Sequence, residues 1–184
     1  MAEEENVAEE ENVAEEENVP AAEQQAEAMQ FQLQKLYVKD VSFELPNAPD
    51  IFQDTGQAEI KMNLSQRVND VTDNIFEVVL TVTVTALSGE KTAYLAEVHQ
   101  AGLFHISGFN EQNQHTVLNT MCPHTLFPYA SRIITDLVGD GGFPPLVLQP
   151  INFDQVYAQR LAEAKTQQEG NPDQGQDLDV QGSA

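Results

Sequence analysis

A long β-hairpin constrains the fold of this chain more than any other feature. Residues 75–87 are rich in Val and Thr, which favour strands, and they alternate through most of the run. Residues 88–90, Ser-Gly-Glu, have the composition of a tight turn, and residues 91–109 then form a returning strand. We expect a bulge at Gly102 in this second run. A hairpin of this length is stable only when it packs against further structure, so the chain must build a sheet around it.

Two further strands are predicted before the hairpin. Residues 31–44 and 58–64 alternate between apolar and polar side chains, which is the pattern of half-buried strands. The start of the first run is expected to place one set of side chains on a common face: Phe31, Leu33, Lys35 and Tyr37. Residues 46–56 are rich in Pro and polar residues and predict a long irregular connection, whereas residues 65–74 are interpreted as a turn. Four strands joined in this way suggest an antiparallel meander.

The C-terminal third is predicted to be helical. Residues 126–138 have apolar side chains at helical spacing, Pro128 suits a first helical turn, and the glycines that follow end the helix. Residues 143–150 are extended and bounded by Pro, and Asn152 caps a final helix. The predicted fold class is α+β, with a four-stranded antiparallel sheet followed by two to three helices that cover one sheet face. The Val and Thr content of the other face favours burial in an oligomer.

The charge of the chain is unevenly distributed. The net charge is −22, from 30 acidic and 8 basic residues, and residues 1–28 contain the sequence AEEENV three times and no basic residue. We predict a disordered acidic tail at 1–28, a folded domain at 29–166 and a disordered C-terminal tail at 167–184. The repeat is either a tandem expansion without a specific partner, which is the more ordinary interpretation, or a polyanionic arm. Such an arm would guard a hydrophobic surface or steer basic partners.

This composition argues against several classes of partner and location. Nucleic acid and anionic membrane surfaces both recruit clustered Lys and Arg, which are scarce here. No apolar run approaches the roughly 20 residues of a membrane span, and the acidic N-terminus does not resemble a signal peptide. The single cysteine, Cys122, excludes an intrachain disulfide. Together these features predict a cytoplasmic protein.

No catalytic, cofactor or metal site is predicted. Cys122 and His124 are two residues apart, but a cysteine nucleophile also needs a base and a group that orients the base. His99 and His105 are too far apart along one strand to share a metal ion, and the glycines at 139–142 lack the lysine of a phosphate-binding loop. We expect Cys122 to be a small buried residue, and we predict that the protein is not an enzyme.

Two short groups of residues each share one face of a strand. Side chains alternate along a strand, so Asp40, Ser42 and Glu44 point the same way, as do Leu95 and Glu97. Strand acids ordinarily face solvent and suppress pairing at a sheet edge, so the spacing alone assigns them no further role.

A second unusual feature is the apolar content of segments that should be surface loops. The irregular connection and the C-terminal third both contain such residues: Phe43, Leu45, Pro46, Ile51, Phe52, Pro128, Tyr129 and the segment 143–148. They either anchor loops against the core or line a hydrophobic groove for an extended peptide.

Several blocks of the sequence resemble the SecB family of bacterial protein-export chaperones. They follow one another with family-like spacing across residues 29–165: MQFQLQKLYVKDVSFELPNAP, FEVVLTVTVTA, TAYLAEVHQAGLFHISG, CPHTLFPYAS and FPPLVLQPINFD. The first block alone is specific, whereas residues 1–28 have no counterpart in the family.

The resemblance implies a fold, an activity and partners. SecB proteins are ATP-independent chaperones that bind unfolded preproteins, keep them competent for translocation and deliver them to the SecA motor ATPase. They are tetramers, arranged as dimers of dimers, with a four-stranded antiparallel sheet in each subunit. The alternative is a general anti-aggregation or toxin–antitoxin-linked SecB-like chaperone without SecA docking. The presence of Asp40, Leu95 and Glu97 argues against that alternative.

The resemblance also implies two sets of site residues. The acidic patch that docks SecA corresponds to Asp40, Glu44, Leu95 and Glu97. The groove that binds client peptides is placed around Phe43, Pro46, Phe52, Tyr129, Leu146 and Leu148.

Overall fold

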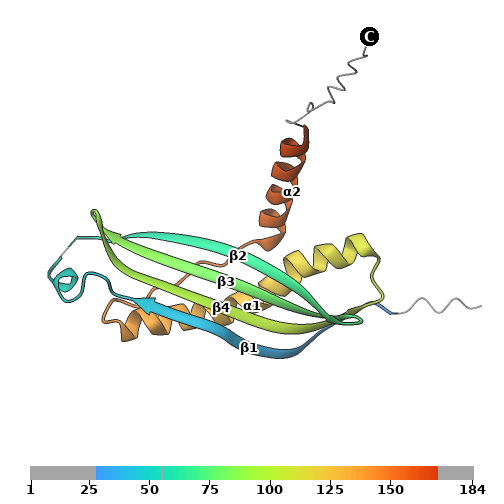
Figure 1. Ribbon diagram of the computed structural model, residues 1–184, viewed down its shortest axis with the longest axis horizontal. Coiled ribbons are helices and arrows are strands. Elements are labelled where there is room, and N and C mark those ends of the chain that lie inside the picture. The colour runs from blue at the N-terminus through green and yellow to red at the C-terminus, as the bar shows by residue number, and fades with distance from the viewer. Residues whose placement is uncertain (1–27, 55, 170–184) are drawn as a thin grey trace, which may run out of the picture.

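The computed structural model describes residues 28–54 and 56–169, so most of the two predicted tails, 1–27 and 170–184, lies outside the described residues. One four-stranded sheet has a long helix across one face, and a second helix projects away from it (Figure 1). The elements in chain order are β1 (Gln30–Glu44), the 3-10 helix η1 (Asp50–Gln53), β2 (Glu59–Thr72), β3 (Ile75–Ser88), β4 (Lys91–Ser107), α1 (Glu111–Asp140) and α2 (Phe153–Glu169). The predicted α+β class, with four antiparallel strands followed by helices, is confirmed.

The order of the strands differs from the predicted meander. The sheet order is β1-β4-β3-β2, so β1 pairs with β4 and is not a neighbour of β2. The connection between β1 and β2, which contains η1, therefore carries the chain from one edge of the sheet to the other. This span explains the length of the irregular connection, and the buried side chain of Ile51 anchors it to the core.

Strand β2 is longer than predicted, because it continues through residues 65–72 instead of turning there. Its polar residues fit the strand because alternate ones point to the exposed side, whereas Val68 packs against the core. The side-chain amide of Gln66 is satisfied by the carbonyl of Leu118 at 2.9 Å. The turn itself is shorter and includes Asn74, which has a positive φ of 62°.

Two irregularities in β1 change which of its side chains share a face. The pairing with β4 skips one residue between Leu33 and Lys35 and another between Val38 and Asp40, as β-bulges do. Simple alternation groups Lys35 and Tyr37 with Phe31 and Leu33, and this prediction is wrong. The register places the following β1 residues on the helix side of the sheet: Phe31, Leu33, Leu36, Val38, Val41 and Phe43.

Helix α1 begins well before the predicted position at residue 126. It starts at Glu111, where the Asn110 side chain accepts a hydrogen bond from the backbone N–H of Asn113 at 2.8 Å, and it contains Pro123 and Pro128 in its interior. An interior proline costs a helix about 3 kcal/mol. Burial of one full side of α1 against the sheet offsets this cost. The buried residues on that side include Val117, Leu118, Cys122, Leu126, Ala130, Ile134 and Val138.

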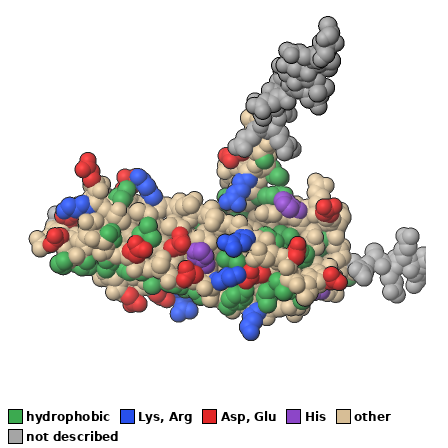
Figure 2. Space-filling view, in the orientation of Figure 1, with side chains coloured by type: hydrophobic (Ala, Val, Ile, Leu, Met, Phe, Trp, Pro, Cys, Tyr) green, Lys and Arg blue, Asp and Glu red, His purple; other side chains and the backbone are tan. Residues whose placement is uncertain are grey.

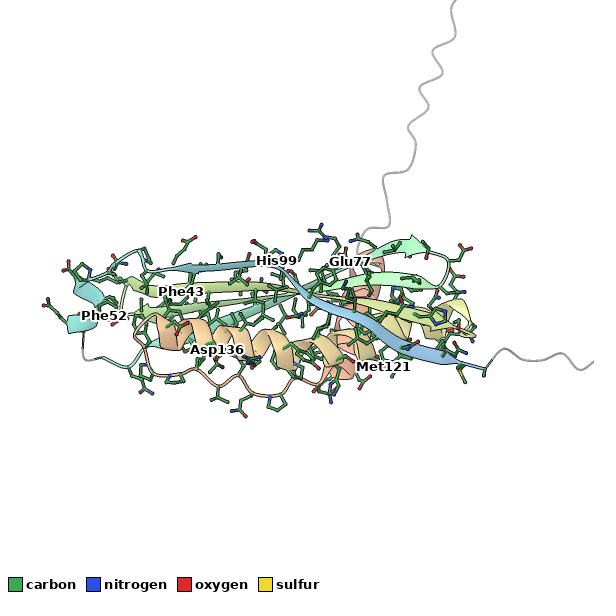
Figure 3. All side chains as sticks on the ribbon, turned by 90° about the horizontal axis from the view of Figure 1, so that it is seen from below. Phe43, Phe52, Glu77, His99, Met121 and Asp136 are labelled. Carbon is green, nitrogen blue, oxygen red and sulfur yellow. The ribbon has the colours of Figure 1, made fainter. Side chains whose placement is uncertain are left out.

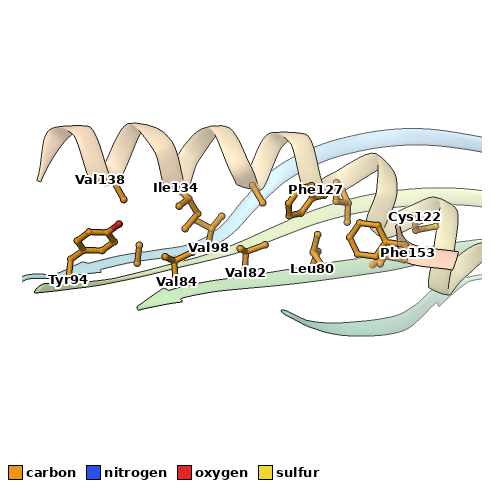
Figure 4. Packing of buried hydrophobic residues seen from close by; sticks show 14 of the residues in the cluster. Leu80, Val82, Val84, Tyr94, Val98, Cys122, Phe127, Ile134, Val138 and Phe153 are labelled. Atoms are coloured by element: carbon orange, nitrogen blue, oxygen red, sulfur yellow. The ribbon is translucent and has the colours of Figure 1, made fainter. Parts of the chain in front are cut away.

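The core lies between α1 and the face of the sheet that it covers, which we call the inner face (Figure 4). The residues of β3 and β4 on this face include Leu80, Val82, Val84, Tyr94, Val98, Phe104 and Ile106. Gly102 is not at a bulge of β4, contrary to the prediction, because both of its ladders are regular there. A glycine is needed here because neighbouring side chains pack closely against the backbone. A Cβ at this position would lie 2.8 Å from the ring of Phe104 and 3.0 Å from the side chain of Leu126.

After α1 the chain returns along the helix and then forms α2. The hydroxyl of Thr135 donates to the carbonyl of Leu146 at 2.6 Å, which ties the extended segment to α1. The predicted cap is confirmed, because the Asn152 side chain accepts from the backbone N–H of Gln155. Helix α2 continues to Glu169, slightly beyond the predicted end of the domain. Within the described ranges no helix is long and apolar enough to cross a membrane.

Candidate functional site

The predicted acidic residues lie together on the sheet face opposite α1, which we call the open face. The register of β1 and β4 forms three cross-strand pairs on it: Asp40 with His99, Ser42 with Glu97, and Glu44 with Leu95. Directly paired residues point to the same side of a sheet, so the predicted face-sharing of both groups is confirmed. Figure 3 shows His99 and Glu77 on the side of the sheet away from α1, and Figure 2 looks onto the open face.

Glu97 is held in place by two neighbours that sequence reasoning did not assign to the site. The hydroxyl of Thr83 on β3 donates to Oε2 at 2.7 Å, and Nε2 of His99 lies 2.9 Å from Oε1. These hydrogen bonds lower the pKa of Glu97, with that from Thr83 contributing most. The carboxylate is therefore charged and oriented before any partner arrives.

A second carboxylate on the open face, that of Glu77, accepts four hydrogen bonds. The ammonium of Lys39 donates to its two oxygens at 2.8 and 2.9 Å, the amide of Asn69 donates at 2.8 Å, and the hydroxyl of Tyr37 also donates. These donors lower the pKa of Glu77 to about 2, with Lys39 the largest cause. Burial, together with the adjacent carboxylate, raises the pKa of Tyr37 to about 12.

Sequence reasoning missed Glu77, although one signal was present. It is the single charged residue in the Val- and Thr-rich run at 75–87, and a charge in such a strand calls for a partner. Its partners come from β1 and β2. The predicted meander placed β2 beside β3 but assigned Asn69 to a turn, and it did not bring β1 within reach of Glu77.

Part of the predicted groove forms an aromatic cluster near the C-terminal end of α1. Phe43 stacks on Tyr94 with ring centroids 5.8 Å apart, Tyr94 lies 4.9 Å from Phe143, and Phe143 lies 5.4 Å from Phe52. The Phe43 ring fits against α1 only because residue 141 is glycine, since a Cβ there would lie 2.4 Å from the ring. Phe52 is 51% exposed, so the cluster presents an apolar surface to solvent.

The remaining predicted groove residues lie elsewhere. Leu146 and Leu148 pack against the core, and Leu148 also lines an open hollow beside α1 together with Phe127 and Pro128. Pro46 is exposed, and it lies between Phe43 and Phe52 in the sequence. Tyr129 is 47% exposed on α1 and makes none of the aromatic pairs found in the described part of the chain. The structure therefore brings Phe43 and Phe52 together, but it does not unite all six residues in one groove.

Cys122 is fully buried in the core, as predicted. Burial raises the pKa of its thiol, so the sulfur stays protonated and unreactive. Among the described residues, no group of three or more His, Cys, Asp or Glu side chains could hold a metal ion.

Comparison with known families identifies the chain. The sequence model of the family described as Preprotein translocase subunit SecB matches residues 23–164, so the family counterpart begins at residue 23 and not after residue 28 as expected. The chain belongs to the SecB family. SecB proteins are protein-export chaperones and not an enzyme family, which agrees with the resemblance seen in the sequence.

Relatives named Protein-export protein SecB are similar over most of the chain. The one from Xanthomonas euvesicatoria is 51% identical over 74% of this chain and 81% of its own length. The one from Stenotrophomonas maltophilia is 53% identical over 74% and 80%. The one from Alkalilimnicola ehrlichii is 46% identical over 88% and 87%.

A solved structure shares the SecB fold. It is a SecB-like chaperone from Mycobacterium tuberculosis in complex with an antitoxin peptide, with a TM-score of 0.56 over 66% of this chain and 90% of that one. The sequence identity is 18%, so this similarity concerns the fold alone.

Proposed function

We propose that this SecB-family protein is an ATP-independent chaperone that binds unfolded preproteins in the cytoplasm and delivers them to SecA. The observation that carries the delivery step is the placement of Asp40, Glu44, Leu95 and Glu97 in neighbouring positions of two paired strands on the open face. We call these four residues the docking patch. They combine three carboxylates with one apolar side chain on a face that no helix of the described chain covers (Figure 1).

The docking patch suits a cationic segment of a partner. Complementary charges steer the encounter and fix its orientation, and their effect on the association rate exceeds their effect on affinity. Glu97 is already oriented by Thr83 and His99, so little side-chain entropy is lost when a Lys or Arg binds it. Leu95 is half-buried beside Glu44 and offers an apolar contact at the same position.

Client binding is assigned to the exposed aromatic cluster and the apolar segment that follows α1. An unfolded chain presents apolar side chains in no fixed order, so recognition through many weak apolar and backbone contacts is expected. The cluster of Phe43, Phe52, Tyr94 and Phe143 supplies aromatic surface, and Val147, 73% exposed, extends it along the chain.

A tetramer, built as a dimer of dimers, accounts for the apolar side chains that the single chain leaves in solvent. Val38 and Val41 are exposed on the edge strand β1, and Met121 and Tyr129 are exposed on the side of α1 away from the sheet. Apolar side chains grouped on a strand edge and on a helix surface mark surfaces that an oligomer covers.

Charge reversal in the docking patch tests the proposal. Asp40→Lys with Glu44→Lys should weaken binding to purified SecA by at least about tenfold at low salt, while binding of an unfolded preprotein is unchanged. Glu59→Lys with Glu90→Lys is the matched control, because both carboxylates are exposed and neither belongs to the patch. If the patch variant binds SecA normally, the protein is a SecB-like chaperone without docking at this face. If SecA and preprotein binding fall together, the assignment of separate sites is wrong.

A further inference from the structure

Glu77 connects three strands of the open face. It lies on β3, whereas its donors Tyr37 and Lys39 lie on β1, and β4 runs between these two strands. On β4, the register pairs Tyr37 with Ala101 and Glu77 with Leu103. Ala101 is fully buried, and its small side chain leaves room for the donors to cross β4. From β2, on the other side of β3, the side-chain amide of Asn69 donates a further hydrogen bond to the Glu77 carboxylate.

The second bulge of β1 points Lys39 toward this carboxylate. Val38 pairs with Gln100 and Asp40 pairs with His99, so Lys39 is the extra residue between them. Without that extra residue, Lys39 and Asp40 would point to opposite faces. The bulge lets Lys39 reach Glu77 while Asp40 joins the docking patch.

This arrangement separates a cation from the docking patch. Lys39 is adjacent to Asp40 in the chain, and its side chain is 45% exposed. Both oxygens of Glu77 hold its ammonium, and the Glu77 side chain itself is only 12% exposed. Without that carboxylate, a flexible lysine side chain could turn toward Asp40 and oppose the approach of a cationic partner.

We propose that Glu77 is a positioning residue for SecA docking, which holds the ammonium of Lys39 away from Asp40 and thereby keeps the docking patch negative. This inference rests on the proposed function of the patch. It assigns a role in docking to a residue that is outside the patch and largely shielded from a partner.

Three variants separate this charge effect from a structural effect. Glu77→Gln keeps the shape of the side chain and releases Lys39, so SecA binding should weaken roughly fivefold, as expected for one like charge several ångströms away. Glu77→Gln combined with Lys39→Met lacks the same ion pair but has no free cation, so binding should return to within about twofold of wild type. Glu59→Gln, which removes an exposed charge from the far edge of the same face, should change binding by less than about twofold.

Binding is measured with purified full-length protein and SecA at low and at high salt, and thermal unfolding is recorded in parallel. The loss in Glu77→Gln should shrink at high salt, because screening weakens the interaction between exposed charges. The inference is overturned if Glu77→Gln binds SecA as tightly as wild type. It is equally overturned if the double variant binds as weakly as Glu77→Gln, since loss of the network's structure would then be the cause.

The proposed function and this inference can fail separately. If Asp40→Lys with Glu44→Lys leaves SecA binding unchanged, the docking patch is wrong and the role of Glu77 falls with it. If that variant weakens binding but Glu77→Gln does not, the patch stands and only the role of Glu77 is rejected.

Discussion

The two faces of the sheet are built from the same strands but are stabilised in different ways. On the inner face, apolar side chains such as Val82, Val84 and Val98 fill the space under α1, and their volumes determine how closely the helix packs. On the open face, carboxylates such as Glu77 and Glu97 are each surrounded by donors from neighbouring strands. The inner face therefore determines whether the chain folds, and the open face determines which charges it presents to a partner.

Strand β4 shows this difference most directly, because its successive side chains point alternately to the inner face and the open face. Ala96 and Val98 are fully buried under α1, whereas Glu97 and His99 between and after them remain accessible. A change on one face should leave the other nearly intact, because adjacent side chains point in opposite directions. Substitutions in the core, at Glu77 and in the aromatic cluster test that independence, and their expected effects decrease in that order.

The largest effect is expected in the core. Leu126 is fully buried and its side chain packs over Gly102, so Leu126→Ala should lower the free energy of unfolding by about 3 kcal/mol. The exposed Arg132→Ala on the same helix should cost less than about 0.5 kcal/mol. Urea unfolding of both variants measures the difference. Equal effects would show that contact with the sheet does not determine the stability of α1.

Glu77 on the open face should account for part of the loss of folding stability at low pH. The pKa of Glu77 is about 2 in the folded protein against an ordinary 4.5, so the unfolded chain takes up the proton first as the pH falls. The stabilisation is present above pH 4.5 and is lost between about pH 4.5 and 2, by roughly 2–3 kcal/mol. Glu77→Gln should lack this part of the pH dependence. Urea unfolding of both proteins at neutral pH and below pH 4.5 measures it, and parallel pH profiles would contradict the prediction.

The smallest effect is expected at the aromatic cluster, where a matched pair of glycines is available. Gly141→Ala places a methyl group against the ring of Phe43 and should cost about 1–2 kcal/mol, with weaker binding of an unfolded preprotein. At Gly139, where a Cβ meets nothing within 4 Å, the same change should be neutral or stabilise by up to about 1 kcal/mol. Thermal unfolding and a preprotein-binding assay compare them. Unchanged preprotein binding in Gly141→Ala would remove Phe43 from the client groove.

Several elements could be predicted because their signals are local. The hairpin of β3 and β4 followed from alternation and a glycine turn, and the Asn152 cap followed from one side chain near its own backbone. The helix start at residue 126 was wrong because Pro128 is normally placed in a first turn, whereas burial of α1 tolerates two interior prolines. The turn at 65–74 was wrong because polar residues in an exposed strand resemble a loop.

The candidate site divides in the same way. Asp40, Ser42 and Glu44 could be placed on one face from the sequence, because alternation along a strand is a local property of the backbone. The same holds for Leu95 and Glu97, and the order of the sequence blocks indicated the SecB family. That β1 lies beside β4, so that the two groups meet, and that Lys39 reaches Glu77 are consequences of the folded structure. Strand order, bulges and cross-sheet ion pairs depend on contacts between distant segments, and no local pattern encodes their free energy.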